Sequence, residues 1–223
     1  MKQMAMLAAV GCILAFGGLT LGAGAQVEDP AEQLRTLLDS DHGYPEVVAT
    51  VDGDPVYGRE LSLRIEMMEQ DPTWAGRSVE TIALGSLVGD RLLLLKAREL
   101  GIWPSENEVT ERIARIQSEY AKAGAGSSVR TAIDTALSVQ GLTIDELQTN
   151  QSVRAVYERA LAIAKVHQYV WQSLPPAEKG DSDKVLAAQD ALLKASWERA
   201  NIVVEIGVTP ELPPLDTSGQ SLD

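Results

Sequence analysis

Apolar residues recur at helical spacing through most of the chain, and the most apolar stretch lies near its centre. Residues 59–70 place Leu61, Ile65 and Met68 on one helical face. Residues 78–100 leave little polar surface, so we expect this helix at the centre of a helical bundle. The same periodicity predicts further helices over residues 106–120, 129–140, 144–173 and 182–200.

Helix-start and helix-stop signals bound several of these helices. Ser105 and Glu108 have the spacing of a capping box, and Thr143 and Glu146 repeat it. Gly101 follows the central helix and is suited to a left-handed cap. The long helix that ends near residue 173 is therefore expected to begin directly after Thr143.

Two short stretches with strand character lie at opposite ends of this helical region. Residues 47–51 ("VVATV") are followed by the turn Asp52-Gly53-Asp54-Pro55 and a short return strand. An isolated two-stranded hairpin is marginal in water, so this hairpin needs a further partner. Residues 202–206 ("IVVEI") carry the only other strong strand signal. We therefore predict a mainly α fold closed by a small sheet, in which the N-terminal hairpin pairs with the C-terminal strand.

The first 25 residues have the pattern of a secretory signal peptide. Lys2 gives a positive start, an almost entirely apolar stretch follows, and Ala23-Gly24-Ala25 has the small residues of a cleavage site. The alternative is an uncleaved anchor, because the apolar stretch could nearly span a bilayer. Cys12, the only cysteine, would leave with the segment on cleavage. We expect an exported protein of the periplasm or cell envelope, in contact with membrane only through this segment before cleavage.

The rest of the chain is expected to have three parts. Residues 26–45 are polar, with a proline near each end, and are predicted to form a flexible arm. Residues 46–206 are predicted to form one helical domain. Residues 207–223 contain three prolines and are predicted to be a disordered tail.

The charge of the chain argues against some classes of partner. The chain has 19 Lys and Arg residues and 32 Asp and Glu residues, which gives a net charge of −13. Such a chain is poorly suited to nucleic acid or an anionic membrane, because phosphate contacts need clustered Lys and Arg. No pattern indicates a small-molecule substrate either, so we expect neither nucleic acid nor a small molecule as the partner.

Residue patterns of common catalytic and metal sites are missing. His42 and His167 are the only histidines, and neither has a second His or a Cys at metal-ligand spacing. The carboxylate pairs in Asp52-Gly53-Asp54 and Asp181-Ser182-Asp183 lie in a turn and at a helix start, where Asp is favoured structurally. There is no Gly-x-Ser-x-Gly, no Gly-rich phosphate loop and no His-Glu-x-x-His. We therefore expect no catalytic residue, no metal, no cofactor and no enzyme activity.

Two features of the helices indicate contact surfaces. Leu63 and Met67 form a second apolar stripe on the helix over residues 59–70, roughly opposite the first. They pack on a neighbouring helix or, if exposed, provide a flexible apolar contact, and they are the candidate peptide-binding residues. Gly85 and Gly89 permit close helix contact, which we interpret as ordinary packing.

The order of these elements resembles the N-terminal chaperone domain of SurA and of related secreted parvulin-type foldases such as PrsA. The resembling stretches follow one another as in that domain, from a strand-turn-strand to a closing helix and strand. They are "VVATVDGDPVYGREL", "LVGDRLLLLKARELGIWPSENEVTERIARI", "LSVQGLTIDELQTNQSVRAVYERALAIAKV" and "ALLKASWERANIVVEI". The resemblance covers about residues 46–206.

One departure from the family decides what the resemblance implies. In much of that family a parvulin prolyl isomerase domain lies between the long helix and the closing helix. The stretch from Trp171 to Asp181 is far shorter than the roughly 50 residues that a domain needs. The resemblance therefore implies the chaperone part alone, and no catalytic residue is carried over.

The resemblance implies an ATP-independent chaperone, a holdase, that binds unfolded or extended segments of exported proteins. The alternative is a non-catalytic structural or adaptor protein of the envelope that recognises one specific partner. A parvulin-type prolyl isomerase comes third, and it would follow from the family's name alone.

Overall fold

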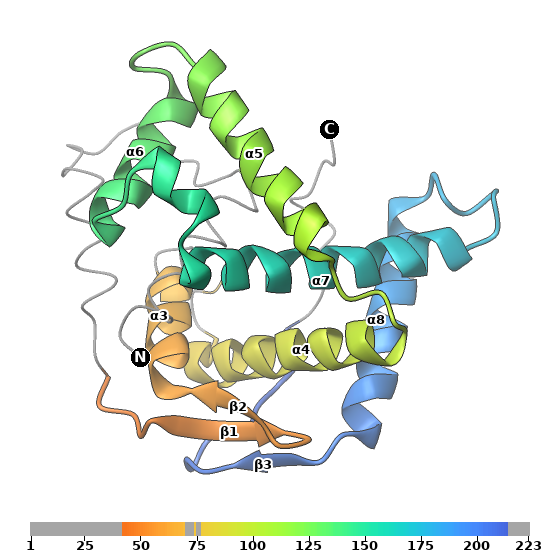
Figure 1. Cartoon of the computed structure of the whole chain (residues 1–223). Helices are drawn as coiled ribbons and strands as arrows, with labels where there is room; N and C mark the ends of the chain where they lie inside the picture. Colours follow the sequence, from red (N-terminus) through yellow and green to blue (C-terminus); the bar gives the residue numbers. More distant parts are fainter. Residues whose placement is uncertain (1–41, 70–73, 75–76, 214–223) are drawn as a thin grey trace. The chain divides into compact units, whose positions relative to one another are not determined.

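The computed structural model describes residues 42–69, 74 and 77–213, and these residues are mainly helical (Figure 1). The predicted signal peptide and nearly all of the predicted arm lie outside them. The elements in chain order are β1 (Val47–Val51), β2 (Asp54–Tyr57), α3 (Gly58–Glu69), α4 (Val79–Glu99), α5 (Glu106–Lys122), α6 (Ser128–Gln140), the 3-10 helix η2 (Ile144–Gln148), α7 (Gln151–Ser173), α8 (Ser182–Arg199) and β3 (Ile202–Val204).

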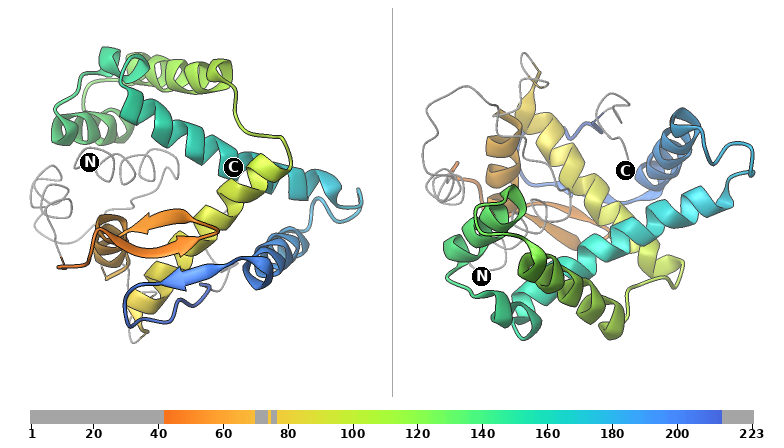
Figure 2. Two further views of the ribbon diagram at one scale, coloured as in Figure 1. Left: turned by 60° about the horizontal axis from the view of Figure 1, so that its bottom comes forward. Right: turned by 90° about the horizontal axis from the view of Figure 1, so that it is seen from above.

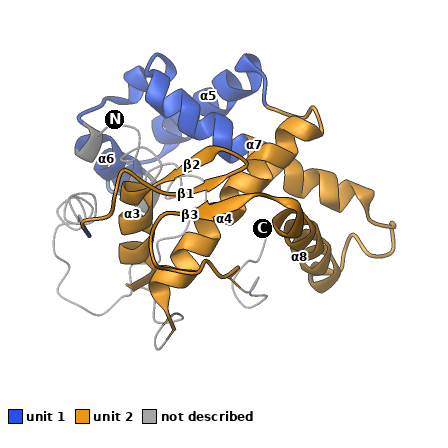
Figure 3. Ribbon diagram, turned by 90° about the horizontal axis from the view of Figure 1, so that it is seen from below, with its two compact units in different colours: residues 1–42, 104–161 blue, residues 43–103, 162–223 orange. Residues whose placement is uncertain are grey.

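The chain divides into two compact units where the sequence analysis expected one domain over residues 46–206 (Figure 3). The inserted unit contains Pro104–Leu161 and is built from α5, α6, η2 and the first half of α7. The sheet unit contains Gly43–Trp103 and the described residues from Ala162 onward. It is therefore assembled from two stretches that are distant in the sequence.

The predicted closure of the chain by its two ends is confirmed. The sheet has the strand order β2-β1-β3, and β3 runs antiparallel to β1 with Thr50 opposite Val203 (Figure 2). Backbone hydrogen bonds extend the pairing at both ends of β3. The N–H of Asp52 donates to the carbonyl of Asn201 at 3.0 Å, and the N–H of Glu205 donates to the carbonyl of Val48 at 2.9 Å.

The core of the sheet unit forms between the sheet and α4. Ala49, Val51 and Val56 have no exposed surface, and neither have Leu84 and Val88 of α4. Helix α4 packs against β1, β2, α3 and α8. The sequence analysis placed this most apolar helix at the centre of a bundle, and in the sheet unit it is the common partner of the strands and helices.

The inserted unit has its own small apolar core, in which Ile113, Ile116, Leu147 and Tyr157 are buried. Burial raises the pKa of Tyr157 to about 12. At the start of α5 the predicted capping box is confirmed: the Ser105 hydroxyl accepts from the N–H of Glu108.

The predicted single helix from residue 144 to residue 173 is wrong at its start. The Glu146 carboxylate does accept from the N–H of Thr143 at 2.7 Å, but the turn that follows is the 3-10 helix η2. Helix α7 begins only at Gln151, because Asn150 Oδ1 accepts from the N–H groups of Ser152 and Val153 at 3.0 and 3.1 Å. An Asn in this position ends one helix and caps the next.

The described beginning of the predicted disordered tail is packed. Residues 207–213, which we name the C-terminal segment, lie on the sheet unit, and Val208 and Leu212 are partly buried against its core. Residues 214–223 lie outside the described residues. Burial of its apolar side chains holds the segment on the sheet unit. A proline-rich composition alone does not predict this burial.

We predict that Val203→Pro lowers the free energy of unfolding by about 1–3 kcal/mol, because it leaves the Thr50 carbonyl without a donor. The bonds at Asn201 and Glu205 place the N–H of Val203 toward β1, since hydrogen-bonded positions alternate along an antiparallel strand. Denaturant unfolding measures the effect. Val203→Ala is the matched control: the Val203 side chain is 42% exposed, so its loss should cost about 0.5 kcal/mol. Equal stability of the two variants would contradict the pairing.

Candidate functional site

Helix α3 carries both apolar stripes that the sequence predicted. Leu61, Ile65 and Met68 are buried in the core of the sheet unit, as expected for the first stripe. In the second stripe, Leu63 is only 7% exposed and Met67 is partly buried. Of the two candidate peptide-binding residues, Met67 thus retains more accessible surface, and Leu63 is enclosed.

A polar contact holds α3 on α4 beside this stripe. The Arg64 guanidinium donates to the Ser86 hydroxyl at 2.6 Å and to the Asp90 carboxylate at 2.9 Å. Both partners lie on α4, about one helical turn from each other. Arg64 therefore joins α3 to α4 at two positions. This link holds α3 against α4 at the residue next to Leu63.

A buried ion pair closes the outer edge of β2. Arg91 and Glu60, whose side chains are 9% and 8% exposed, are joined by a 2.5 Å contact. Arg91 Nε also donates to the Pro55 carbonyl at 2.9 Å, and Glu60 accepts from the N–H of Tyr57 at 3.2 Å. Pro55 has no N–H of its own, so at these two residues the edge leaves no backbone group for another strand: the Pro55 carbonyl and the Tyr57 N–H are both bonded within the chain.

His167 of α7 is half-buried within the sheet unit. Burial lowers the pKa of its imidazole, and the nearby Asp90 carboxylate opposes this shift. Asp90 also binds Arg64, so the imidazole faces a carboxylate that is already paired. His167 is therefore a helix residue whose ring is partly desolvated.

Gly85 of α4 contacts the C-terminal segment, whereas Gly89 lies against Leu193 of helix α8 as well as against Leu212, so the expected close helix contact is found at Gly89 alone. At Gly85 a Cβ atom would overlap the backbone of Glu211. The N–H of Glu211 donates to the carbonyl of Thr81 at 3.2 Å, one turn earlier on α4. At Gly89 a Cβ atom would lie 3.6 Å from Leu193 and 3.8 Å from Leu212, which is ordinary contact. We name the surface formed by Thr81, Gly85 and Gly89 the glycine face of α4.

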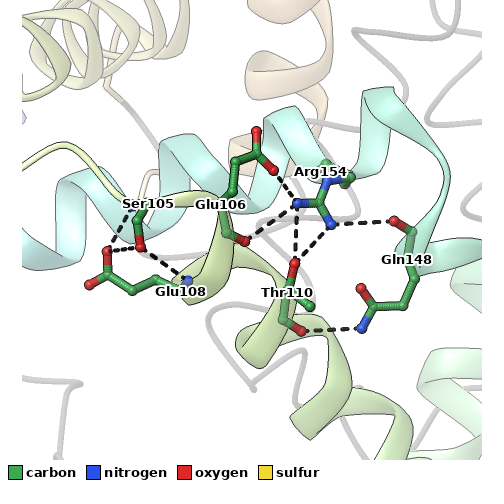
Figure 4. A network of polar contacts seen from close by, with 6 residues as sticks. All are labelled: Ser105, Glu106, Glu108, Thr110, Gln148 and Arg154. Atoms are coloured by element: carbon green, nitrogen blue, oxygen red, sulfur yellow. Dashed lines mark hydrogen bonds and ion pairs between the residues drawn. The ribbon is translucent and has the colours of Figure 1, made fainter.

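A polar network ties the start of α7 to α5 in the inserted unit (Figure 4). The Arg154 guanidinium donates to the Glu106 carboxylate at 2.5 Å, to the Thr110 hydroxyl at 3.3 Å and to the Gln148 carbonyl at 3.3 Å. Gln148 in turn donates to the Thr110 carbonyl at 3.1 Å. These bonds join helix ends to one another, and their evident role is to hold the unit together.

The carboxylate pairs have the structural roles predicted for them. Asp52 Oδ1 accepts from the N–H of Asn201 at 2.8 Å, and Asp54 pairs with Arg98 at 2.9 Å. Asp181 Oδ1 caps α8 by accepting from the N–H groups of Asp183 and Lys184. Among residues 42–69, 74 and 77–213, no three His, Cys, Asp or Glu side chains are grouped to hold a metal ion.

None of the described helices is both long enough and apolar enough to cross a membrane. No protein-family model matches the chain, and no curated protein or solved structure matches it.

The buried ion pair gives a stability prediction. Arg91→Met should lower the free energy of unfolding by about 3–5 kcal/mol, because it leaves the Glu60 carboxylate buried without its cation. Lys194→Met is the control, since the Lys194–Asp190 pair is exposed and should contribute about 0.5 kcal/mol or less. Thermal or denaturant melts compare the two variants. A loss for Arg91→Met as small as the control would show that the carboxylate is not desolvated.

His167 gives a prediction of pH dependence. Its pKa is lower in the folded than in the unfolded state, so the unfolded chain binds more protons below its unfolded pKa of about 6.5. Acidification from that pH toward the lower folded pKa should therefore remove stability. His167→Gln should flatten this part of the curve of unfolding free energy against pH, whereas His42→Gln, at an exposed position, serves as control. Identical curves for wild type and His167→Gln would contradict the assignment.

Proposed function

We propose that this protein is an ATP-independent chaperone of the cell envelope that holds unfolded or extended segments of exported proteins. It works as a passive binder: apolar segments of a client are covered by apolar surface of the chaperone, at about 25 cal/mol for each Å² removed from water. No cofactor and no catalytic residue takes part. The partners are polypeptides, with no role for nucleic acid or a small-molecule substrate.

The observation that supports this proposal best is the closure of the sheet unit by both ends of the chain. The strand-turn-strand, the following helix, the apolar helix, and the final helix and strand occur in the order that the resembling chaperone domain implies. The short connection from α7 to α8, residues 174–181, leaves no space for an isomerase domain there. The proposal therefore takes over from the family the binding part and none of its catalysis.

Helix α3 is the first element to test as a client contact. Met67 is partly buried and has an adaptable thioether side chain, which suits contact with varied apolar segments. Leu63, the other candidate, is enclosed, and its replacement by a polar residue would act mainly on stability. The two positions therefore separate a binding effect from a folding effect.

The test measures aggregation of a chemically unfolded client without ATP. The wild-type protein should slow aggregation, and moderate salt should leave this effect intact because apolar contacts are not screened as charge pairs are. Met67→Ser should raise the concentration needed for half protection by about tenfold, which corresponds to a loss of about 1.4 kcal/mol. Its helix content, measured by circular dichroism, should be unchanged.

Glu69→Ser, an exposed change on the same helix, is the matched control and should protect clients like the wild type. The protein should not accelerate cis–trans exchange of a prolyl peptide. A wild-type protein that leaves client aggregation unchanged and binds a single envelope protein tightly would favour the adaptor function instead. The observation that favours that second candidate is the exposure of Tyr169 and Trp171, each 42%, near the end of α7.

A further inference from the structure

The C-terminal segment follows β3 directly and crosses the glycine face of α4. Its backbone meets α4 at Gly85, where the helix has no side chain and Glu211 fills the space of a Cβ atom. Its side chains Val208 and Leu212, four residues apart, pack against the apolar core on either side of this contact. The segment thus binds α4 as an extended peptide would, by its backbone in the middle and by an apolar side chain toward each end.

Few contacts fix this segment in comparison with the core. Among the described residues, one backbone hydrogen bond joins it to α4, from the N–H of Glu211 to the carbonyl of Thr81. Val208 and Leu212 are only partly buried, and Pro210 and Pro213 have no N–H to donate. A segment held in this way is expected to open at a much lower free energy than the β1–β3 pairing.

Binding to the glycine face depends more on the backbone conformation of the bound segment than on the sequence of that segment. At Gly85 and Gly89 the helix surface has no Cβ atoms and lets an extended backbone approach closely, since every residue except proline offers the same N–H and carbonyl groups. Apolar contacts beside it require only that the occupant carries apolar side chains at suitable spacing. Such a surface would accept segments of many different unfolded proteins.

We propose that the glycine face of α4 is a site at which this protein binds extended client segments, in addition to the contact at Met67 of α3, and that its own C-terminal segment occupies this site as a displaceable competitor. This inference rests on the proposed function and names a further site for it. Because the segment is tethered next to the site, it acts at an effective concentration in the millimolar range. A client gains access when it binds the face more strongly than this internal competitor.

Two substitutions in the purified chain separate release of the segment from blockage of the site. Leu212→Ser removes an apolar anchor of the segment and leaves α4 unchanged. Gly85→Ala places a methyl group where the Glu211 backbone lies, which displaces the segment and also blocks any other extended occupant. Gly89→Ala is the matched control, since its methyl group would make only ordinary contacts.

Hydrogen exchange of the Glu211 amide reports release of the segment, because this N–H is bonded to Thr81 in the closed state. Exchange should become faster in Leu212→Ser and in Gly85→Ala, and it should be little changed in Gly89→Ala. Client protection should improve about tenfold in Leu212→Ser and should not improve in Gly85→Ala. Val208→Ser is a second release variant, for use if Leu212→Ser loses helix content.

A labelled peptide with the sequence of residues 207–213, GVTPELP, probes the site without any client. Fluorescence anisotropy should show that it binds Leu212→Ser about tenfold more tightly than the wild type. Binding should be lost in the double variant Leu212→Ser/Gly85→Ala and kept in Leu212→Ser/Gly89→Ala. Equal binding of the peptide by both double variants, or no binding by Leu212→Ser, would overturn the proposed site.

The two assays also separate this inference from the proposed function. If the peptide binds as expected and the wild type and Leu212→Ser both leave client aggregation unchanged, the glycine face is a peptide site and the holdase function is wrong. If clients are protected and protection is the same in wild type, Leu212→Ser and Gly85→Ala, the holdase function stands and the glycine face is not its site.

Discussion

Antiparallel pairing between β1 and β3 is the interaction on which the sheet unit depends. A hairpin of β1 and β2 alone would be marginal in water, and the third strand lets the sheet present a continuous apolar face to α4. Ala49 and Val51 on β1 lie opposite Val204 and Ile202 on β3, so one apolar face is contributed by residues from both ends of the chain. Asp52 strengthens the junction, because its backbone N–H and its carboxylate both bond to Asn201. The position of α4 behind the sheet, and of α8 that leads into β3, follows from this pairing.

The two edges of the small sheet are treated differently. At the β2 edge, Arg91 and Glu60 satisfy polar groups that would otherwise pair with another strand, and Pro55 removes one donor. Strand β3 is short, and the chain leaves it to lie on α4. The first edge is thus closed by buried charge, which is costly to disturb. The second adjoins the C-terminal segment, in which, among the described residues, one backbone hydrogen bond reaches α4.

Helix periodicity, capping residues and the strand signals at both ends are local patterns, and they predicted the helices, the capping box at Ser105 and the closure of the sheet. Contacts between distant backbones leave no such pattern. The sequence around Gly85 indicates helix packing. In the structure, Gly85 instead contacts the backbone of Glu211, which lies more than a hundred residues later in the chain. The burial of Leu63 had the same cause: periodicity tells which residues share a face of α3, but what covers that face depends on the rest of the fold. Asn150 has the weaker signal in the sequence, because Thr143 and Glu146 show the full capping-box pattern of a helix start.

The division into an inserted unit and a sheet unit has a consequence for the order in which the protein is made. Asp52 and Asn201 are 149 positions apart, so at about 5–20 residues per second the ribosome needs roughly 7–30 s to supply the partner of β1. During that interval the sheet unit lacks its last strand, while the residues Pro104–Leu161 are continuous and can already form their own core. The nascent chain therefore passes through a stage in which residues Pro104–Leu161 can fold and β1 cannot yet pair with β3. During this stage the apolar face of β1 is accessible to factors that bind the chain at the exit of the ribosome.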